Sequence, residues 1–277
     1  MDRAIIIGTF EFIGFSLCKH LLDQGCEIDG IHIIKGEEDP YLADKRLEIG
    51  RNANFSEKEY TEWMASKEEI LKDTVIFIDI YDFYLKNKLS AIRENEIIEN
   101  YLIHKKNELE KANSKIVFLF PLQWLKDINR AHSRCERAIE VLKEKNIAVH
   151  SFYLPAIYGP WQPKEFIFHQ AILDKKTAEL NNREWVHDAI FIDDLIYSIL
   201  EESEKNKGGS YLLKSSLSGH WQKCAEYLSL EFSKSHSYDD LEKGKIIEKT
   251  VRDSIRYSEG LEQQRRHLQA LAKRNGT

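Results

Sequence analysis

Gly8 and Gly14, near the start of the chain, have the spacing of a turn that could hold phosphate groups. The turn follows the apolar run at 4–7. Such a turn opens a helix whose bare backbone N–H groups bind a pyrophosphate in dinucleotide folds. Glu11 lies in the middle of the turn, so it places a carboxylate where a diphosphate would have to approach. The candidate cofactor-binding residues here are Gly8, Phe10, Glu11, Phe12, Ile13 and Gly14.

A second group of candidate binding residues follows the next expected strand, at 27–34. Dinucleotide folds usually end this strand with an acid that binds the ribose hydroxyls. His32 holds that position here, and Lys35 lies just beyond it. We therefore expect no NAD(P), or weak NAD(P) binding. In the alternative interpretation, Gly8 and Gly14 serve only the packing of strand on helix, and His32 is a strand-end residue.

Composition narrows the classes of function. The 277 residues carry a net charge of -6, with an isoelectric point near 6.0, so no overall basic surface points to nucleic acid. No run of about 18 apolar residues and no signal-peptide pattern is present, so we expect a soluble, cytoplasmic protein without a membrane span. Widely spaced cysteines make a disulfide or a zinc site improbable, and no metal site is expected; they are Cys18, Cys26, Cys135 and Cys224.

The elements that must position these residues alternate between strand and helix. Such alternation predicts an α/β fold with a Rossmann-like, doubly wound parallel sheet. We expect a nucleotide-binding-type domain at 1–155 and a smaller C-terminal lobe at 156–277, with 186–202 returning to the main sheet. The expected strands are 27–34, 46–49, 73–81, 115–120, 148–154 and 210–213, and the expected helices are 13–24, 57–71, 89–111, 129–145 and 261–273. A strand at 189–191 should turn directly into a helix that is N-capped near Asp193 or Asp194.

The order of these motifs resembles the extended short-chain dehydrogenase/reductases, the NAD-dependent epimerase/dehydratase family that acts on nucleotide sugars. The resemblance covers nearly the whole chain, and the order and spacing of the motifs carry it. The matching segments are the GxxxxxG turn at 8–14, Asp73-Thr-Val-Ile76, Cys135-Glu136, Leu154-Pro-Ala-Ile-Tyr-Gly-Pro160, Ile192-Asp-Asp194 and Ser258-Glu-Gly-Leu261.

The same resemblance implies that the catalytic residues of the family are missing. Family members use a Ser or Thr after the fifth strand, and a Tyr and a Lys four residues apart, with the Tyr as general acid/base. Gln123 stands at the Ser/Thr position, Ile128 at the Tyr position and His132 at the Lys position. Since Ile128 cannot exchange a proton, we expect no catalytic residue at these positions. In the cofactor groove, Asp79 and Ile80 replace two small residues of the family.

The substrate half keeps more of the family pattern. Tyr158 and Gln162 lie in a segment that could shape a loop beside a nucleotide, and His187 stands where the family has an Arg that binds phosphate. A nucleotide-sugar ligand is therefore possible.

Three functions remain open from the sequence. The first is a catalytically degenerate homologue that acts as a binding, scaffolding or regulatory protein. The second is an active epimerase, dehydratase or reductase with displaced acid/base groups, drawn from His132, His150, Tyr153 and Tyr158. The third is a protein-interaction module that uses the fold as a scaffold for a protein partner. The resemblance also implies a homodimer through the helices at 89–111 and 129–145.

Overall fold

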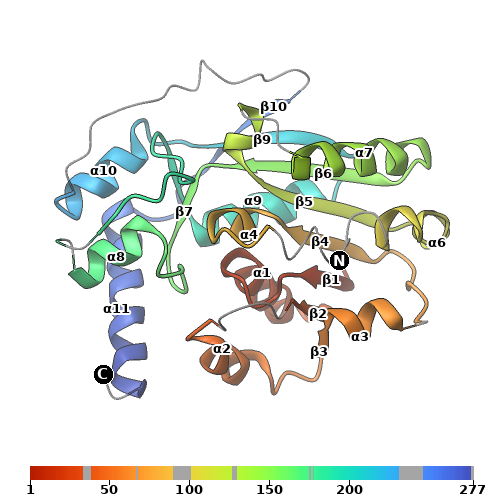
Figure 1. Cartoon of the computed structure of the whole chain (residues 1–277), viewed down its shortest axis with the longest axis horizontal. Coiled ribbons are helices and arrows are strands. Elements are labelled where there is room, and N and C mark those ends of the chain that lie inside the picture. The colour runs from red at the N-terminus through yellow and green to blue at the C-terminus, as the bar shows by residue number, and fades with distance from the viewer. Residues whose placement is uncertain are drawn as a thin grey trace.

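Eight parallel strands form one continuous sheet at the centre of the molecule (Figure 1). The computed structural model describes residues 1–33, 39–66, 68–89, 101–126, 130–174, 176, 178–230 and 246–275. The strand order is β10-β9-β6-β5-β4-β1-β2-β3, and every neighbouring pair is parallel. The strands are β1 (Arg3–Ile7), β2 (Glu27–His32), β3 (Phe55–Glu59), β4 (Val75–Asp79), β5 (Lys115–Pro121), β6 (Ala148–Leu154), β9 (Gly209–Ser215) and β10 (Ile247–Val251).

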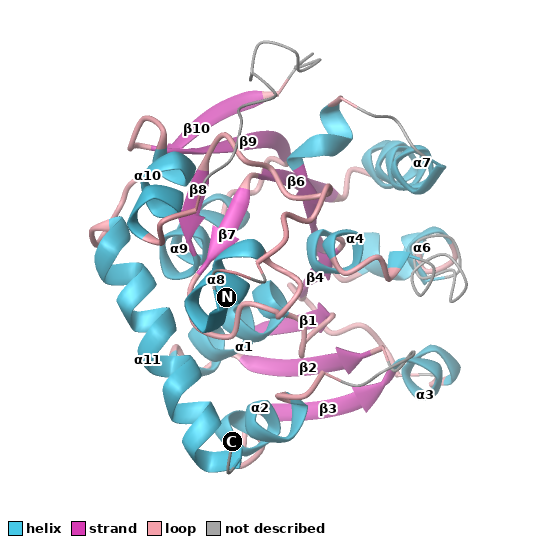
Figure 2. Cartoon of the chain, turned by 60° about the vertical axis from the view of Figure 1, so that its left-hand side comes forward, coloured by secondary structure: helices cyan, strands magenta, loops and turns pink. Residues whose placement is uncertain are grey.

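Helices cover both faces of this sheet. Figure 2 shows α1, α9 and α11 on one side and α3, α6 and α7 on the other. Two separate apolar layers hold them, one on each face. The helices are α1 (Phe12–Asp23), α2 (Leu42–Ile49), α3 (Tyr60–Ala65), α4 (Tyr81–Leu85), α6 (Lys106–Lys111), α7 (Arg130–Glu144), α8 (Ile167–Asp174), α9 (Ile192–Ser203), α10 (His220–Tyr227), α11 (Tyr257–Asn275) and the 3-10 turn η2 (Leu122–Leu125).

The predicted doubly wound parallel sheet is confirmed. The central strands are buried along their length because helices cover both of their faces, and this is why they read as unbroken apolar runs in the sequence. The strand order reverses between β1 and β4, where Ile7 pairs with Ile78. In open α/β sheets, ligands bind outside the carboxyl ends of the strands at such a reversal. Gly8 and Asp79 therefore lie where this fold puts its ligand site.

The C-terminal half of the chain is divided between two sheets. β7 (Ala156–Tyr158) and β8 (Ala189–Phe191) pair with each other in a small two-stranded sheet, whereas β9 and β10 extend the main sheet at one edge. The segment 186–202 thus contributes α9 to the main sheet, through contacts of α9 with β6, while its strand β8 stays outside. The boundary at residue 155 stays a prediction.

Three predicted elements differ in the structure. The strand expected at 46–49 is wrong: these residues belong to α2, whose buried Leu42 and Ile49 lie two turns apart on one face. The helix expected at 57–71 is shorter, because β3 takes its first residues by pairing with β2, and among the described residues of this range only α3 is helical. Of the helix expected at 89–111, the structure describes α6, and 90–100 lie outside the described residues.

The start of α9 is also corrected. Phe191 is the N-cap residue of this helix, and Asp193 and Asp194 lie in its first turn. Acids in a first turn stabilise a helix through its dipole, so the acidic pair marked the right end of the helix but not its cap. Within the described part of the chain, no helix is long and apolar enough to cross a membrane.

Candidate functional site

The turn between β1 and α1 is tight, and both of its glycines are needed for backbone packing. Gly8 has a φ of +94°, a conformation that favours glycine. A Cβ atom on Gly14 would lie 2.1 Å from the carbonyl oxygen of Gly8. The start of α1 is thus pressed directly onto the turn, which supports the packing interpretation of the two glycines.

Two buried aspartates occupy the N-terminus of α1. The N–H of Ile13 donates to Oδ2 of Asp82 at 2.8 Å, and the N–H of Gly14 donates to Oδ2 of Asp79 at 3.3 Å. The two carboxyl groups are joined through the N–H of Asp82, which donates to Oδ1 of Asp79 at 3.0 Å. Asp79 is 1% exposed and Asp82 0%. The backbone donors that dinucleotide folds offer to a pyrophosphate are therefore bonded to the chain's own carboxyl groups.

Burial changes the acidity of this pair. Burial first, and then the neighbouring Asp82, raise the pKa of Asp79 well above its ordinary value. Burial also raises the pKa of Asp82. Two carboxylates this close in a dry site disfavour a double negative charge, so burial favours the protonated form of at least one of them.

Glu11, the residue predicted to obstruct the turn, is neutralised by a buried lysine. Nζ of Lys86 lies 2.6 Å from Oε2 of Glu11, and both side chains are largely buried. Burial alone would lower the pKa of Lys86, but Glu11, with Asp39 and Asp82 behind it, raises it. The carboxylate is thus held inside the protein as an ion pair.

Phe10 and His32 fill the space at the carboxyl ends of β1 and β2. Phe10 is 2% exposed, and its ring packs edge-on against His32 at 5.2 Å and against Phe55 at 6.3 Å. The guanidinium of Arg46 lies 5.4 Å from the Phe10 ring centre and binds Glu57, which is 3.9 Å from His32. Where a ribose would need an acidic partner, the chain thus has a packed aromatic pair. Lys35 lies outside the described residues.

The remaining predicted residues of the turn belong to the core. Phe12 and Ile13 are fully buried, and the Phe12 ring packs edge-on against Phe166 at 6.2 Å. The structure therefore brings Gly8, Phe10, Glu11, Phe12, Ile13, Gly14 and His32 together at the carboxyl ends of β1 and β2. Their role in binding a cofactor stays a prediction.

Lys45, which the sequence did not single out, supports the other side of the turn. Its side chain is buried, and Nζ donates to the carbonyl of Phe10 and to Asp39, each at 2.7 Å. The ammonium also lies 5.6 Å from the ring centre of Phe15 and 5.9 Å from that of Trp161. In the sequence Lys45 is one of several charged residues in its segment, so only the tertiary fold shows that it is buried against the β1–α1 turn.

Gln123, at the predicted Ser/Thr position, is used in a structural contact. It lies in η2 directly after β5, and its Nε2 donates to the carbonyl oxygen of Arg183. The guanidinium of Arg183 lies over the ring of Tyr84, 6.0 Å from its centre. The next residues are also anchored, since Trp185 is buried in the same apolar layer as β5. The segment around Arg183 therefore covers the end of β5.

An aromatic cluster surrounds His132, the residue at the predicted Lys position. The ring of His132 lies 5.2 Å from Trp124 and 6.1 Å from Phe120, and Phe120 lies 5.4 Å from Tyr153. Glu136 joins the two polar members, with His132 Nε2 at 3.4 Å and the Tyr153 hydroxyl at 3.5 Å. Burial, and then Glu136, raise the pKa of Tyr153. Ile128 lies outside the described residues.

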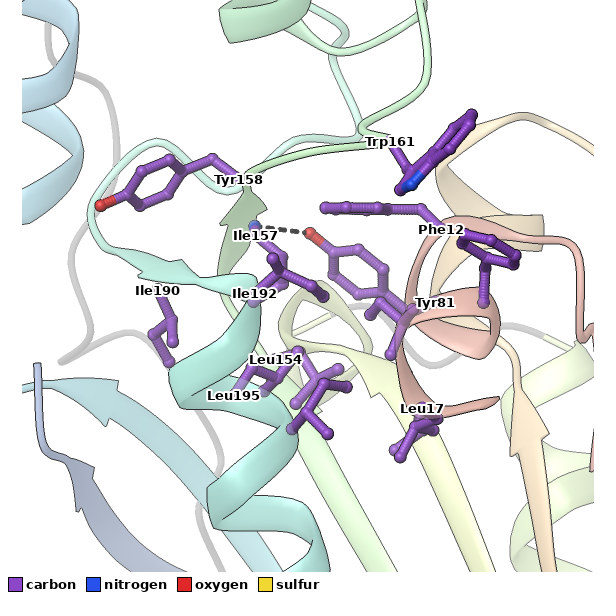
Figure 3. Close-up of a cluster of buried hydrophobic side chains, with 14 of the residues drawn as sticks. Phe12, Leu17, Tyr81, Leu154, Ile157, Tyr158, Trp161, Ile190, Ile192 and Leu195 are labelled. Atoms are coloured by element: carbon purple, nitrogen blue, oxygen red, sulfur yellow. Dashed lines mark hydrogen bonds between the residues drawn. The ribbon is translucent and has the colours of Figure 1, made fainter. Parts of the chain in front are cut away.

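The substrate-type residue Tyr158 points away from the turn. Figure 3 shows its side chain directed away from Phe12 and α1. Its hydroxyl lies 3.0 Å from Nε2 of His220, whose Nδ1 lies 2.7 Å from the hydroxyl of Ser215. Beside it, the hydroxyl of Tyr81 accepts the N–H of Ile157 at 3.1 Å. Tyr158 is therefore part of a buried polar chain that joins β7 to α10.

Gln162 and His187 also have structural contacts. Gln162 donates to the carbonyl of Ile157 at 2.7 Å and accepts from Gln264 of α11 at 2.7 Å. His187 is half-buried, with its ring 5.2 Å from that of Trp185. Gln162 thus joins α11 to the segment after β7, and His187 follows the segment around Arg183 that covers the end of β5. Whether either binds a substrate stays a prediction.

A small cavity lies beside the ion pair of Glu11 and Lys86. Its volume is about 80 Å³, several times smaller than that of typical pockets for organic ligands. It has room for a few water molecules, not for a dinucleotide. Among the described residues, no group of three or more His, Cys, Asp or Glu side chains could hold a metal ion. The cavity is lined by Asp39, Pro40, Tyr41, Lys86, Lys88, Pro163, Lys164 and Glu165.

Comparison with curated proteins gives two uncharacterized relatives. The protein YjaV of Bacillus subtilis is 33% identical over 64 residues, which are 22% of this chain and 34% of that protein. The protein MJ1055 of Methanocaldococcus jannaschii is 25% identical over 236 residues, 73% of this chain and 72% of that protein. The chain thus spans about a third of the first relative's length. No protein-family model matches the chain.

Solved structures match this chain over nearly its whole length. UDP-glucuronic acid 4-epimerase from Bacillus cereus, in complex with UDP-glucuronic acid and NAD, has a TM-score of 0.66 at 16% identity, over 97% of this chain and 99% of that one. The dTDP-glucose 4,6-dehydratase of Bacillus anthracis, in complex with NAD, has a TM-score of 0.65 at 11% identity, over 99% and 98%. The chain therefore has the fold of the NAD-dependent epimerases and dehydratases of nucleotide sugars, and the resemblance read from the sequence is confirmed for the fold.

Proposed function

We propose that the chain is a catalytically degenerate homologue of the nucleotide-sugar epimerases and dehydratases, and that it acts as a non-catalytic binding, scaffolding or regulatory protein. One observation carries the proposal: the amide of Gln123 is bonded to the carbonyl of Arg183, at the position where the family resemblance implies a Ser or Thr on the substrate oxygen. The segment bound in this way covers the end of β5, where a sugar would have to enter.

The acidity of the nearby groups supports the same proposal. A catalytic tyrosine of this family needs a cation beside it, because a positive charge lowers the pKa of the phenol. Tyr153 has the opposite surroundings, since burial and the carboxylate of Glu136 raise its pKa. His132, at the position of the family's Lys, lies against the rings of Trp124 and Phe120, and the residue four positions before it is Ile128 and not a tyrosine. The site is thus built to pack and not to transfer protons.

The proposal also covers the compartment and the partners of the protein. All four cysteines are free and buried, which supports a reducing compartment such as the cytoplasm. A homodimer through the two segments predicted as helices at 89–111 and 129–145, and a nucleotide sugar or a protein as the bound partner, belong to the same proposal. The solved relatives bind NAD with a nucleotide sugar or alone, so these ligands are the first to test.

An active enzyme with displaced groups is the second candidate. The observation that favours it is the contact of Glu136 with both His132 and Tyr153, which brings an acid, a base and a phenol into one cluster. If this cluster were catalytic, Tyr153→Phe would abolish turnover while leaving the fold intact.

The test is a turnover assay on the purified full chain. UDP-glucuronic acid and dTDP-glucose are each incubated with NAD and with NADP. The products are followed by nicotinamide absorbance, by mass spectrometry of the sugar nucleotide, and by proton NMR, which distinguishes epimers of equal mass. We expect no product above the level of a heat-inactivated control. Turnover that Tyr153→Phe abolishes, with an unchanged circular dichroism spectrum, would refute the proposal and favour the second candidate.

A further inference from the structure

The four carboxyl oxygens of Asp79 and Asp82, at the N-terminus of α1, have only three hydrogen-bond donors among the described residues. Three of the four oxygens accept a backbone N–H: the two of Asp79 from Gly14 and Asp82, and Oδ2 of Asp82 from Ile13. The fourth, Oδ1 of Asp82, is buried without a partner. A buried ionised oxygen left without a donor is strongly disfavoured. One proton placed on the pair would supply the missing donor.

The charges around the pair indicate the same proton. Two lysines and two further acids lie in the same region, but they already pair with one another: Lys86 with Glu11, and Lys45 with Asp39. Neither lysine is therefore left to balance two negative charges on Asp79 and Asp82. A single negative charge on the pair matches the partial positive charge of the α1 N-terminus.

We propose that Asp79 and Asp82 share one proton, and that the carboxyl of Asp82 held in this way is a built-in ligand of α1, in the place where dinucleotide folds hold a pyrophosphate. The chain thus carries its own anion at this site. The inference does not rest on the loss of catalysis, because it concerns the β1–α1 turn and not the cluster at Gln123 and His132. The raised pKa of Asp79 agrees with it.

The place at the N-terminus of α1 where a diphosphate would bind is therefore occupied by the chain's own carboxyl groups. It has not simply lost the residues that would hold a cofactor. An incoming diphosphate would find the N–H groups of Ile13 and Gly14 already bonded. It would also bring negative charge next to the Asp pair and to Glu11, whose carboxylate already uses Lys86. We therefore expect the wild-type chain not to bind pyrophosphate or NAD at millimolar concentration.

The shared proton is tested by infrared spectroscopy of the full chain labelled with ¹³C-aspartate. At neutral pH we expect one protonated carboxyl band, which disappears in Asp79→Asn. Asparagine is nearly isosteric with the protonated acid and donates to Asp82, so this variant should fold. The matched control is Asp23→Asn, an exposed acid at the other end of α1, which should keep the band. Absence of the band from the wild-type chain at neutral pH would overturn the shared proton.

The built-in ligand is tested by calorimetry with inorganic pyrophosphate and with NAD. Removing two of the three carboxyl groups next to the turn, in Glu11→Gly with Asp82→Ser, frees the N–H of Ile13 and leaves Lys86 available for an anion, while Asp79 stays bonded to the N–H of Gly14. We expect pyrophosphate affinity to rise at least about tenfold over the wild-type chain. Pyrophosphate or NAD binding by the wild-type chain that equals binding by the folded double variant would overturn the inference. If the double variant does not fold, the wild-type chain alone provides the test: binding of pyrophosphate or NAD at millimolar concentration would overturn the built-in ligand.

Discussion

Asp82 caps helix α1 from a distance of 69 residues in the sequence, with its Oδ2 2.8 Å from the N–H of Ile13. Helix caps usually come from the residue that precedes the helix. Here that residue is Glu11, which makes no capping bond and instead pairs with Lys86. The cap therefore ties the first turn of α4, which follows β4, to the start of α1, at the point where the strand order reverses.

The first prediction concerns the strength of this cap. Asp82→Ala leaves the N–H of Ile13 without an acceptor in a buried site, so we expect a loss of about 1 to 3 kcal/mol in the free energy of unfolding. Urea unfolding measures it. Asp193→Ala is the matched control: Asp193 is a partly exposed acid in the first turn of α9, 3.9 Å from His20, and its loss should cost less than about 0.5 kcal/mol. Equal losses in the two variants would contradict the capping role.

The second prediction concerns the pH dependence of stability that comes from Asp79. Its pKa is raised in the folded chain, so the folded state binds more protons than the unfolded state above pH 3.8. The stabilisation is full below that pH and is lost as the pH rises through the folded pKa. Asp79→Asn cannot lose a proton, so its unfolding free energy should fall less with rising pH. Parallel pH profiles for the two proteins in urea unfolding would count against the raised pKa.

The third prediction concerns Glu184, a buried acid that accepts the N–H of Ile167 at 2.9 Å. Burial raises its pKa from 4.5 to about 8. Its contribution to stability should therefore decline as the pH rises from about 4.5 to 8, by roughly 3 to 5 kcal/mol. Glu184→Gln should remove this decline while matching the wild-type chain at pH 5. Thermal unfolding over that pH range is the measurement. A variant whose free energy of unfolding declines with pH as much as that of the wild-type chain, or more, would contradict the raised pKa of Glu184.

The fourth prediction concerns Gly14. Its substitution by alanine would place a Cβ 2.1 Å from the carbonyl oxygen of Gly8, so the turn and α1 would have to separate. We expect Gly14→Ala to cost more than about 3 kcal/mol or to prevent folding. Gly25→Ala is the control, because its φ is +80° but no atom lies within 4 Å, so only about 1 kcal/mol of backbone strain is expected. A similar cost at both positions would show that close packing is not the reason for Gly14.

Much of the fold could be predicted from the sequence because its determinants are local. The apolar runs of β4, β5 and β6 mark strands buried on both faces, and Gly8 and Gly14 mark the first strand-to-helix turn. Prediction failed where most residues of a segment are charged. The strand expected at 46–49 is the end of α2, a helix with two buried apolar residues, Leu42 and Ile49, among polar ones.

The candidate site could be predicted only in part. Glu11 was recognised as an obstacle at the turn because it lies within the motif itself. Its partner Lys86, the cap Asp82 and the buried Lys45 come from distant segments, and nothing in their local sequence distinguishes them from surface charges. The bond from Gln123 to Arg183 likewise joins residues 60 apart. Contacts of this kind depend on the tertiary fold, so pattern reading cannot find them.

The most direct test of the account is the binding of NAD, NADH, NADP and NADPH to the purified wild-type chain by calorimetry, after mass spectrometry for a nucleotide carried through purification. We expect no copurified dinucleotide and no binding heat at millimolar cofactor, because Asp79 and Asp82 occupy backbone donors of α1 and the ring of Phe10 is buried at the end of β1. A copurified dinucleotide, or micromolar binding of any of the four cofactors to the wild-type chain, would contradict this expectation and would make the chain a cofactor-dependent enzyme candidate.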